Sequence, residues 1–309
     1  MGTFRSISRL IPLLCALSLC GAAAAEVDVV APKSPRDLYA EATRYYKGDA
    51  IPRDLARAFG LYQRAAGQGH TASQIQVAQM YARGEGVQRD DARALDWYRK
   101  AADKGYALAQ KAVGDFYRIG RAVAQDYAAA AGWYKKAAEQ GYGGGLCMLG
   151  YLYARGWGVV PDMKKAKTLL EQGMAQDNAC AQHYLAFLYR NALITLLPDT
   201  GKATELDQLA ANNGDPEAQY NTGYVNELGW LTYATDKDAL HWYQLSAEAG
   251  YPPAMERLAA IYANGLLKVK PDAAQAETWQ KRAKEAWTLW GEPRPADPDT
   301  RRYKFMPRP

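Results

Sequence analysis

The chain has 309 residues, of which 49% are hydrophobic and 23% are charged, and its formal net charge is +5 at pH 7. This length fits one large domain, two smaller domains or an array of repeats. The small net charge argues against a nucleic-acid-binding protein, because a phosphate backbone is bound by a strongly basic surface.

The N-terminus has the pattern of a secretory signal peptide. Arg5 and Arg9 precede an apolar run over residues 11–19, and residues 21–25 are small. We predict cleavage after Ala25, which removes two of the 38 basic residues and none of the 33 acidic ones and lowers the net charge from +5 to +3. The mature chain is therefore expected in the periplasm.

Lipidation at Cys20 is a less favoured alternative, because Leu19 stands where a lipoprotein has a small residue before its cysteine. The apolar run is too short to span a bilayer and no later stretch is long enough, so we expect no transmembrane segment. The predicted organisation is a signal peptide (1–25), a linker (26–35), a repeat region (36–290) and a tail rich in proline and arginine (291–309).

The same sequence pattern returns at a nearly constant interval. A glycine follows a helical pattern in five of six units and an aspartate takes its place in one, at Gly69, Gly105, Gly141, Asp177, Gly214 and Gly250. The intervals are 36, 36, 36, 37 and 36 residues. A fixed period of this size indicates stacked units, each of which buries its apolar face only against the next copy.

Each unit has the apolar period of a helix, and turn signals divide it into two helices. The recurring glycine is expected to end the second helix, since a residue past a helix end often needs a positive φ. The segments GEGV at 84–87 and GWGV at 156–159 are expected to form the turn between the helices. An aspartate at or within one residue of the same place suits the start of each second helix, at Asp54, Asp90, Asp126, Asp162, Asp199, Asp236 and Asp272.

Two kinds of side chain recur with the same period and predict how the helices pack. Small residues that allow close helix approach lie nine positions after the recurring glycine or aspartate, at Ala78, Gly114, Gly150, Ala186, Gly223 and Ala259. Large tyrosines recur beside them, at Tyr81, Tyr117, Tyr153, Tyr189 and Tyr262 on first helices and Tyr62, Tyr98, Tyr134 and Tyr243 on second helices. The sequence predicts an all-α protein, an α/α solenoid of about seven helix pairs.

These strings resemble Sel1-like repeats, relatives of the tetratricopeptide repeats. The resemblance rests on the GxGV turns, the Trp-Tyr pairs such as Trp97-Tyr98, the Ala-Gln pairs such as Ala109-Gln110, and a closing Ala-Ala-x-x-Gly. It covers about residues 36–287. It implies an α/α superhelix that usually serves as a protein-binding scaffold, with the first helix of each pair on the concave side.

Repeats 4 to 6 and the C-terminus depart from the pattern. Leu169-Leu170 replaces the Trp-Tyr pair in repeat 4, and residues 191–198 and 228–233 replace the glycine turns of repeats 5 and 6. After Trp290, five of the last 19 residues are proline, which predicts an extended tail. We expect the helix before this tail to cap the last repeat.

No group of residues has the spacing of a catalytic or metal site. His70, His183 and His241 lie in different repeats at different positions, so no pair has metal-ligand spacing on one helix. No serine precedes a lysine by three positions, and neither Lys-Thr-Gly nor Gly-x-Ser-x-Gly occurs. An envelope hydrolase similar to β-lactamases, an activity linked with some exported Sel1-like proteins, is therefore the least favoured hypothesis. We predict no enzyme activity, cofactor or metal.

Cys147 and Cys180 are the cysteines that remain after the predicted cleavage, and they fall on the first helices of repeats 4 and 5. A disulfide requires Cα atoms about 4.4–6.8 Å apart, whereas helix axes pack about 8–10 Å apart. The two can pair only if both side chains point toward each other, and two free thiols are the alternative.

The first helices of repeats 4 to 6 carry aromatic residues outside the packing positions. Repeats 2 and 3 have a mostly polar set there, whereas repeats 4 to 6 present Met148, Tyr151, His183, Tyr184, Phe187, Tyr220 and Tyr224. The turns of the same repeats are also apolar, with Trp157, Leu193, Ile194 and Trp230 as candidates. Contiguous apolar surface favours a partner-binding groove. The alternative is that these side chains fill the inside of a tightly closed superhelix or pack under their own helices.

The sequence thus predicts a periplasmic, non-enzymatic repeat protein, monomeric when free, that binds one or more proteins through its concave groove. Some exported Sel1-like proteins with a signal peptide and a bare repeat array are immunity proteins that block toxic effectors, including type VI phospholipases, and others are envelope scaffolds. The resemblance implies both roles, and the sequence does not separate them.

Overall fold

The computed structural model describes residues 33–195, 197–230 and 233–290, which form fourteen α-helices and one short 3-10 helix, η1. The helices are α1 Pro35–Lys47, α2 Leu55–Gly67, α3 Thr71–Arg83, α4 Asp91–Ala102, α5 Ala107–Ile119, α6 Tyr127–Glu139, α7 Gly143–Arg155, α8 Met163–Met174, α9 Ala179–Arg190, α10 Thr200–Asn212, α11 Pro216–Glu227, α12 Asp236–Glu248, α13 Pro252–Asn264, η1 Leu266–Lys268 and α14 Ala273–Trp290. The predicted signal peptide, most of the predicted linker and the predicted tail lie outside the described residues.

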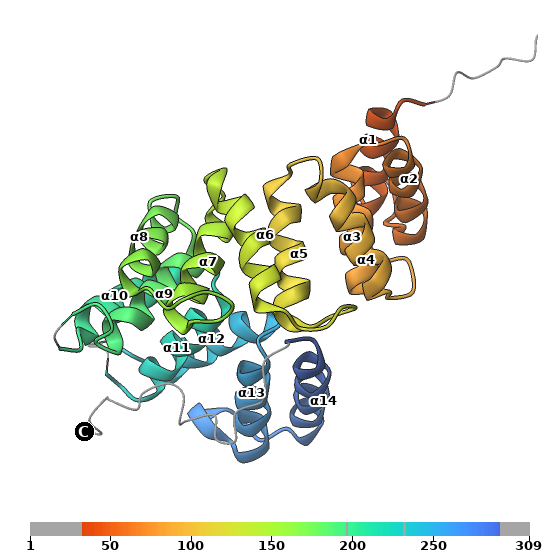
Figure 1. Ribbon diagram of the computed structural model, residues 1–309. Helices are drawn as coiled ribbons and strands as arrows, with labels where there is room; N and C mark the ends of the chain where they lie inside the picture. Colours follow the sequence, from red (N-terminus) through yellow and green to blue (C-terminus); the bar gives the residue numbers. More distant parts are fainter. Residues whose placement is uncertain (1–32, 196, 231–232, 291–309) are drawn as a thin grey trace, which may run out of the picture. The chain divides into compact units, whose positions relative to one another are not determined.

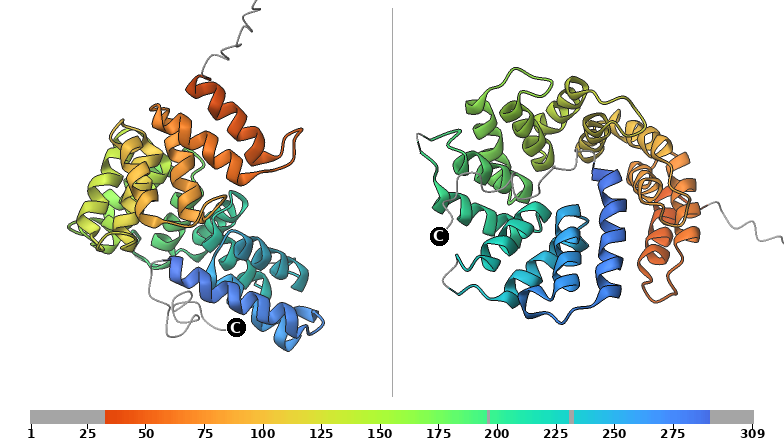
Figure 2. Two further views of the ribbon diagram at one scale, coloured as in Figure 1. Left: turned by 90° about the vertical axis from the view of Figure 1, so that its right-hand side faces the viewer. Right: turned by 90° about the horizontal axis from the view of Figure 1, so that it is seen from below.

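The helices form seven successive pairs, and each helix packs against the next one in sequence (Figure 1, Figure 2). First helices of neighbouring repeats also meet, as α5 does with α7 and α7 with α9. The predicted all-α fold of seven helix pairs is confirmed. All of these helices belong to one unit, residues 34–309. Within the described ranges, no helix has the length and apolar character needed to cross a membrane.

The second helices begin as the recurring aspartate predicts. The Asp54, Asp90, Asp126, Asp162 and Asp199 carboxylates each accept a hydrogen bond of 2.8–2.9 Å from the backbone N–H three residues later. Each bond satisfies an N–H group that lacks a partner inside the helix. Repeat 6 differs, because Thr235 rather than Asp236 is the N-cap and its hydroxyl accepts from the Asp238 N–H at 3.1 Å.

A recurring buried glutamine connects neighbouring repeats at three places. The side-chain amides donate at 3.3 Å to carbonyls near the end of the preceding second helix, from Gln74 to Ala66, Gln110 to Ala102 and Gln219 to Ala211. All three glutamines are buried. The repeated glutamine is therefore a repeated contact between one helix pair and the next.

The recurring small residue makes room for the recurring tyrosine. A Cβ at Gly114 would lie 2.6 Å from the ring of Tyr134, which is fully buried. The Tyr134 hydroxyl donates to Asp115 at 2.8 Å. The tyrosine of the second helix is thus packed and hydrogen-bonded by the first helix of its own repeat.

The turns inside the helix pairs are of two kinds. Repeats 1 to 4 have two residues with positive φ and repeat 7 has three, the second being Ala50, Gly86, Ala122, Gly158 and Leu267 in repeats 1, 2, 3, 4 and 7. The second glycine lies against the preceding repeat, since a Cβ at Gly158 would be 2.2 Å from the Tyr127 carbonyl carbon. Repeats 5 and 6 have one such residue each in the described part of their turns, Ala192 and Gly229. Their turns therefore have a different geometry.

Buried apolar side chains form separate clusters along the chain. One joins repeats 1 to 3, a second runs from repeat 3 to Leu206 in α10, and a third begins at Tyr220 in α11 and covers repeats 6 and 7. Between the second and third clusters, a small group contains Ala210, Ala211 and Ala218. The large apolar clusters are therefore interrupted at the junction of repeats 5 and 6.

Candidate partner-binding surface

A disulfide joins Cys147 on α7 to Cys180 on α9, with the Cα atoms 6.0 Å apart. The two first helices pack against each other, and Cys147 is fully buried at their contact. The side chains thus point toward each other, which is the condition for pairing. The bond cross-links repeats 4 and 5 beneath the predicted groove.

Tyr151 is the centre of an aromatic cluster in repeats 4 and 5. Its ring centroid lies 4.4 Å from that of Tyr184 and 5.5 Å from that of Trp157. The Arg155 guanidinium lies 5.0–5.8 Å from the centroids of Tyr151, Trp157 and Phe187. A cation attracted to three aromatic faces covers them. Part of the aromatic surface predicted for a partner is therefore occupied by the chain itself.

The predicted groove residues do not form one contiguous surface. Met148, Tyr151, His183 and Tyr220 are buried, and Tyr184, Phe187 and Tyr224 are half-buried. The residues of repeats 4 and 5 join the apolar cluster of repeats 3 to 5, whereas Tyr220 and Tyr224 join that of repeats 6 and 7. The expectation of exposed aromatic rings across three repeats is corrected, because these rings complete two separate cores.

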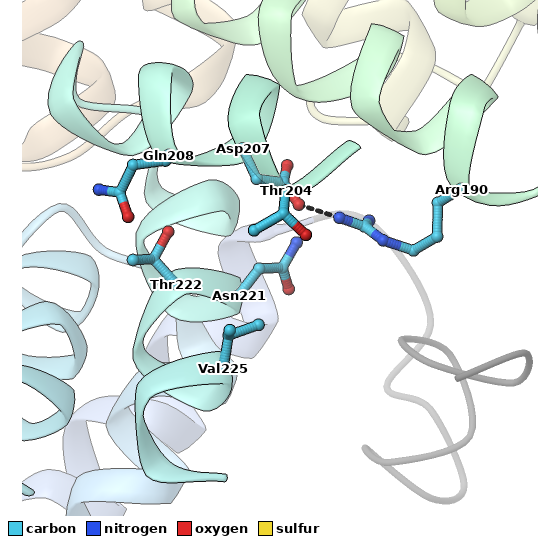
Figure 3. A pocket seen from close by; sticks show the side chains of 7 residues that line it. All are labelled: Arg190, Thr204, Asp207, Gln208, Asn221, Thr222 and Val225. Carbon is cyan, nitrogen blue, oxygen red and sulfur yellow. Dashed lines mark hydrogen bonds and ion pairs between the residues drawn. The ribbon is translucent and has the colours of Figure 1, made fainter. Parts of the chain in front are cut away.

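His183 lies between the two cores in a group of charged residues. Its Nδ1 is 2.9 Å from Asp207 Oδ1 on α10, and its Nε2 is 3.5 Å from Glu217 Oε2 on α11. Arg190, on the same helix as His183, forms an ion pair with the second carboxylate oxygen of Asp207. Figure 3 shows this pair beside a pocket with room for roughly one water molecule. The three helices are thus joined by ion pairs.

Opposed effects set the protonation of this group. Burial alone would lower the pKa of His183, but the charges of Glu217 and Asp215 and the hydrogen bonds to Asp207 and Glu217 raise the pKa well above its usual value. Burial raises the pKa of Asp215 to about 6, although the charge of His183 acts in the opposite direction. The acidic surroundings of His183 therefore favour its protonated form.

Exposed apolar side chains gather in the turns of repeats 4 to 6. We call Val160, Leu193, Leu197, Leu228 and Tyr233 the apolar edge, with exposed fractions of 82%, 37%, 76%, 38% and 90%. These five belong to the nine exposed large hydrophobic residues of the described chain, and the other four are Tyr106, Leu108, Leu209 and Leu289. Of the four turn residues selected from the sequence, Leu193 is exposed, whereas Trp157, Ile194 and Trp230 are half-buried.

The repeats that carry most of this edge are acidic. Residues 178–251 contain nine acids and three lysines or arginines, whereas residues 34–105 contain nine acids and twelve lysines or arginines. Within repeats 5 and 6, exposed acids include Asp199, Glu205 and Asp238. An exposed apolar edge on repeats with an excess of acids is complementary to an apolar surface on a basic protein.

The buried ion pairs were missed by sequence reasoning, although the repeat contains a signal for them. Asp207 occupies the position, seven residues before Gly214, at which second helices of other repeats have the packing tyrosine, as at Tyr134 seven before Gly141. An acid in that position predicts a buried charge that needs a cationic partner. The partners themselves lie 24 and 17 residues away, at His183 and Arg190. In the described part of the chain, no group of three or more His, Cys, Asp or Glu side chains is arranged to hold a metal ion.

The Sel1 repeat model matches seven segments, which are residues 38–70, 71–106, 107–142, 145–178, 181–215, 216–251 and 252–286. The chain belongs to the Sel1 repeat family. Each matched segment covers most of one helix pair, from α1–α2 to α13–α14. The resemblance inferred from the turns and the Ala-Gln and Trp-Tyr pairs is confirmed.

Two of the solved structures that the chain resembles have a similar fold, with TM-scores above 0.5. A Sel1 repeat protein from Oxalobacter formigenes is 29% identical, with a TM-score of 0.58 over 80% of this chain and 99% of that one. A protective antigen of uropathogenic Escherichia coli is 33% identical, with a TM-score of 0.52 over 81% of this chain and 54% of that one. An immunity protein from Pseudomonas aeruginosa is 20% identical, with a TM-score of 0.46 over 89% of this chain and 90% of that one.

The curated relatives are much longer proteins. The chain is 35% and 33% identical to two of them over 85 and 101 residues, and these matches span 9% and 19% of their lengths. Such matches show shared repeats.

Proposed function

We propose that this Sel1 repeat protein binds a partner protein, without catalysis, through the apolar edge of repeats 4 to 6. The observation that carries the proposal is the concentration of exposed large hydrophobic residues in three successive turns. Exposed apolar surface gathered in one region is typical of interaction sites. Tyr233, the most exposed member, and Leu197 supply large apolar area in the turns that differ from those of the other repeats.

The proposed partner surface is apolar at its centre and basic around it. The excess of acids in residues 178–251 supports this, since opposite charge accelerates encounter and disfavours wrong partners. Association should weaken as salt is added, because exposed charges are screened over about 8–10 Å at physiological ionic strength.

The proposed location is the periplasm. Two independent observations support it, the signal-peptide pattern of residues 1–25 and the Cys147–Cys180 disulfide. Disulfides persist in oxidising compartments and are rare in the cytosol.

The test is affinity capture with residues 26–309 as bait, from periplasmic extract and from lysate that expresses the genes adjacent to this one. Paired substitution of Leu197→Asp and Tyr233→Ser should reduce recovery of the partner at least about tenfold, since losing a central apolar anchor costs about 2 kcal/mol or more. Circular dichroism and melting should change little, because both side chains are exposed. The measurement is the amount of partner captured per amount of bait.

The matched control is the pair Tyr106→Ser and Leu108→Asp, which removes an exposed tyrosine and an exposed leucine outside repeats 4 to 6. The control pair should capture as much partner as the wild type. Equal capture by the edge variant, or loss with the control variant alone, would contradict the proposal. A single dominant partner at one-to-one stoichiometry would favour an immunity role, and several envelope proteins would favour a scaffold.

A further inference from the structure

The junction of repeats 5 and 6 is built from polar groups where other junctions are apolar. The apolar cluster of repeats 3 to 5 ends at Leu206, and the next large one begins at Tyr220. Eight of the twelve buried polar or charged residues of the described chain lie between Gln182 and Asn226. The contact of α9 and α10 with α11 therefore depends largely on hydrogen bonds and charge.

A single substitution in the repeat pattern accounts for this difference. Asp207 replaces the tyrosine that fills the second helix of repeats 1, 2, 3 and 6, where Tyr134 and Tyr243 are fully buried. A carboxylate is much smaller than a phenol ring, and a small pocket lies beside it, lined by Thr204, Asn221 and neighbouring side chains. An acid in place of a buried ring thus loses apolar contacts and requires a cationic partner.

The cationic residues of this group lie on α9, and the acidic residues that contact them lie on α10 and α11. His183 and Arg190 both contact Asp207 on α10, and His183 also contacts Glu217 on α11. The side chains of His183 and Asp207 are buried, so losing the charge of His183 removes one of the two cations that Asp207 contacts in a poorly solvated place. The imidazole is the one member of this group that joins α10 and α11 through its two nitrogens.

We propose that the junction of repeats 5 and 6 is a hinge that His183 holds closed by bridging Asp207 and Glu217, and that opens when His183 loses its proton. Deprotonation leaves one imidazole N–H, so the ring can no longer donate to both carboxylates. Opening separates α11 from α9 and α10, with repeats 1 to 4 unchanged. This inference goes beyond the proposed function, and its test needs the protein alone.

The direction of the pH dependence follows from the groups around the imidazole. The charged groups that act on His183 are Asp207 from α10 and Asp215 and Glu217 from α11, and Arg190 from its own helix pairs with Asp207. Helix α7 also packs against α9, and its Cys147 is in a disulfide and does not titrate. The folded pKa of His183 is raised, so its contribution to closure is complete below about pH 6.5 and is lost as pH rises through the folded value.

The test is hydrogen exchange measured by mass spectrometry on the full mature chain from pH 6 to pH 10, with each rate divided by the intrinsic exchange rate. Protection of α10 and α11 should fall by about tenfold per pH unit from about pH 6.5 up to the folded pKa. Protection of α3 and α4 should stay constant over the same range. Equal loss of protection in all repeats would indicate global unfolding and would overturn the hinge.

Two variants separate the hinge from a purely structural role of His183. H183Q removes the titrating group, so protection of α10 and α11 should be low and independent of pH. D215N keeps the N-cap, because an asparagine oxygen can still accept from the Ala218 N–H, but it removes one negative charge near His183. The loss of protection in D215N should end at a lower pH than in the wild type, and its midpoint should fall accordingly, because the folded pKa of His183 is raised less. An unchanged midpoint in D215N would overturn the proposal even if H183Q does not fold.

Discussion

Substitution of Gly158 by alanine is expected to lower the free energy of unfolding by about 3 kcal/mol, because the new methyl group meets backbone that cannot move aside. A Cβ at Gly158 would lie 2.2 Å from the Tyr127 carbonyl carbon and 2.4 Å from the Ala128 nitrogen. Gly158 also has φ of +68°, where alanine is strained. The turn of repeat 4 would have to move away from the backbone at the start of α6. Chemical denaturation measures the loss.

The matched control is Gly132→Ala in α6. Nothing lies within 4 Å of a Cβ built at Gly132, and the position is inside a helix. This variant should be more stable than the wild type by about 0.5–1 kcal/mol, since glycine costs a helix roughly that amount relative to alanine. A small effect of Gly158→Ala, comparable to that of the control, would show that the turn is not seated on the preceding repeat.

The recurring residues in the sequence predict the fold because each one makes a local or nearest-neighbour contact. The aspartates accept a hydrogen bond from the backbone N–H three residues later, at the starts of second helices. The recurring glycines have φ of 73° to 92° just past the ends of the second helices. Asp177, which takes the glycine position in one repeat, adopts the same region with φ of 54°. Contacts that recur in every repeat require the same residue types at the same interval, so the sequence predicts the number of helix pairs.

The candidate site was less predictable because it depends on departures from that period. Met148 and Tyr151 lie outside the recurring packing positions, yet both are buried in the apolar cluster of repeats 3 to 5. The pairing of His183 with Asp207 and Glu217 joins residues in three helices. The spacing of these residues in the sequence does not indicate that they are in contact. The apolar turns were identified, but whether each side chain faced solvent depended on turn geometry particular to repeats 5 and 6.

The disulfide is expected to give the second large effect. Replacement of both cysteines, Cys147→Ala and Cys180→Ser, should lower the free energy of unfolding by about 3–4 kcal/mol, since the bond closes a loop with a sequence separation of 33 in the unfolded chain. Reduction of the wild type should give the same loss, and the variant should not respond to the reductant. Denaturation with and without reductant measures both, and thiol titration of the denatured, unreduced protein should find no free thiol in the mature chain.

The location of the bond decides where that loss should appear. In a repeat array, stability is roughly a sum of units and nearest-neighbour interfaces, so a cross-link between α7 and α9 acts mainly on repeats 4 and 5. Hydrogen exchange of the reduced protein should therefore increase in α7 to α9 while α1 to α4 keep their protection. The apolar edge extends from the turn of repeat 4 to that of repeat 6, so loosening repeats 4 and 5 raises the ordering cost of binding. Partner affinity should fall when the disulfide is reduced. If the reduced protein binds with wild-type affinity, the binding energy comes from repeat 6 alone.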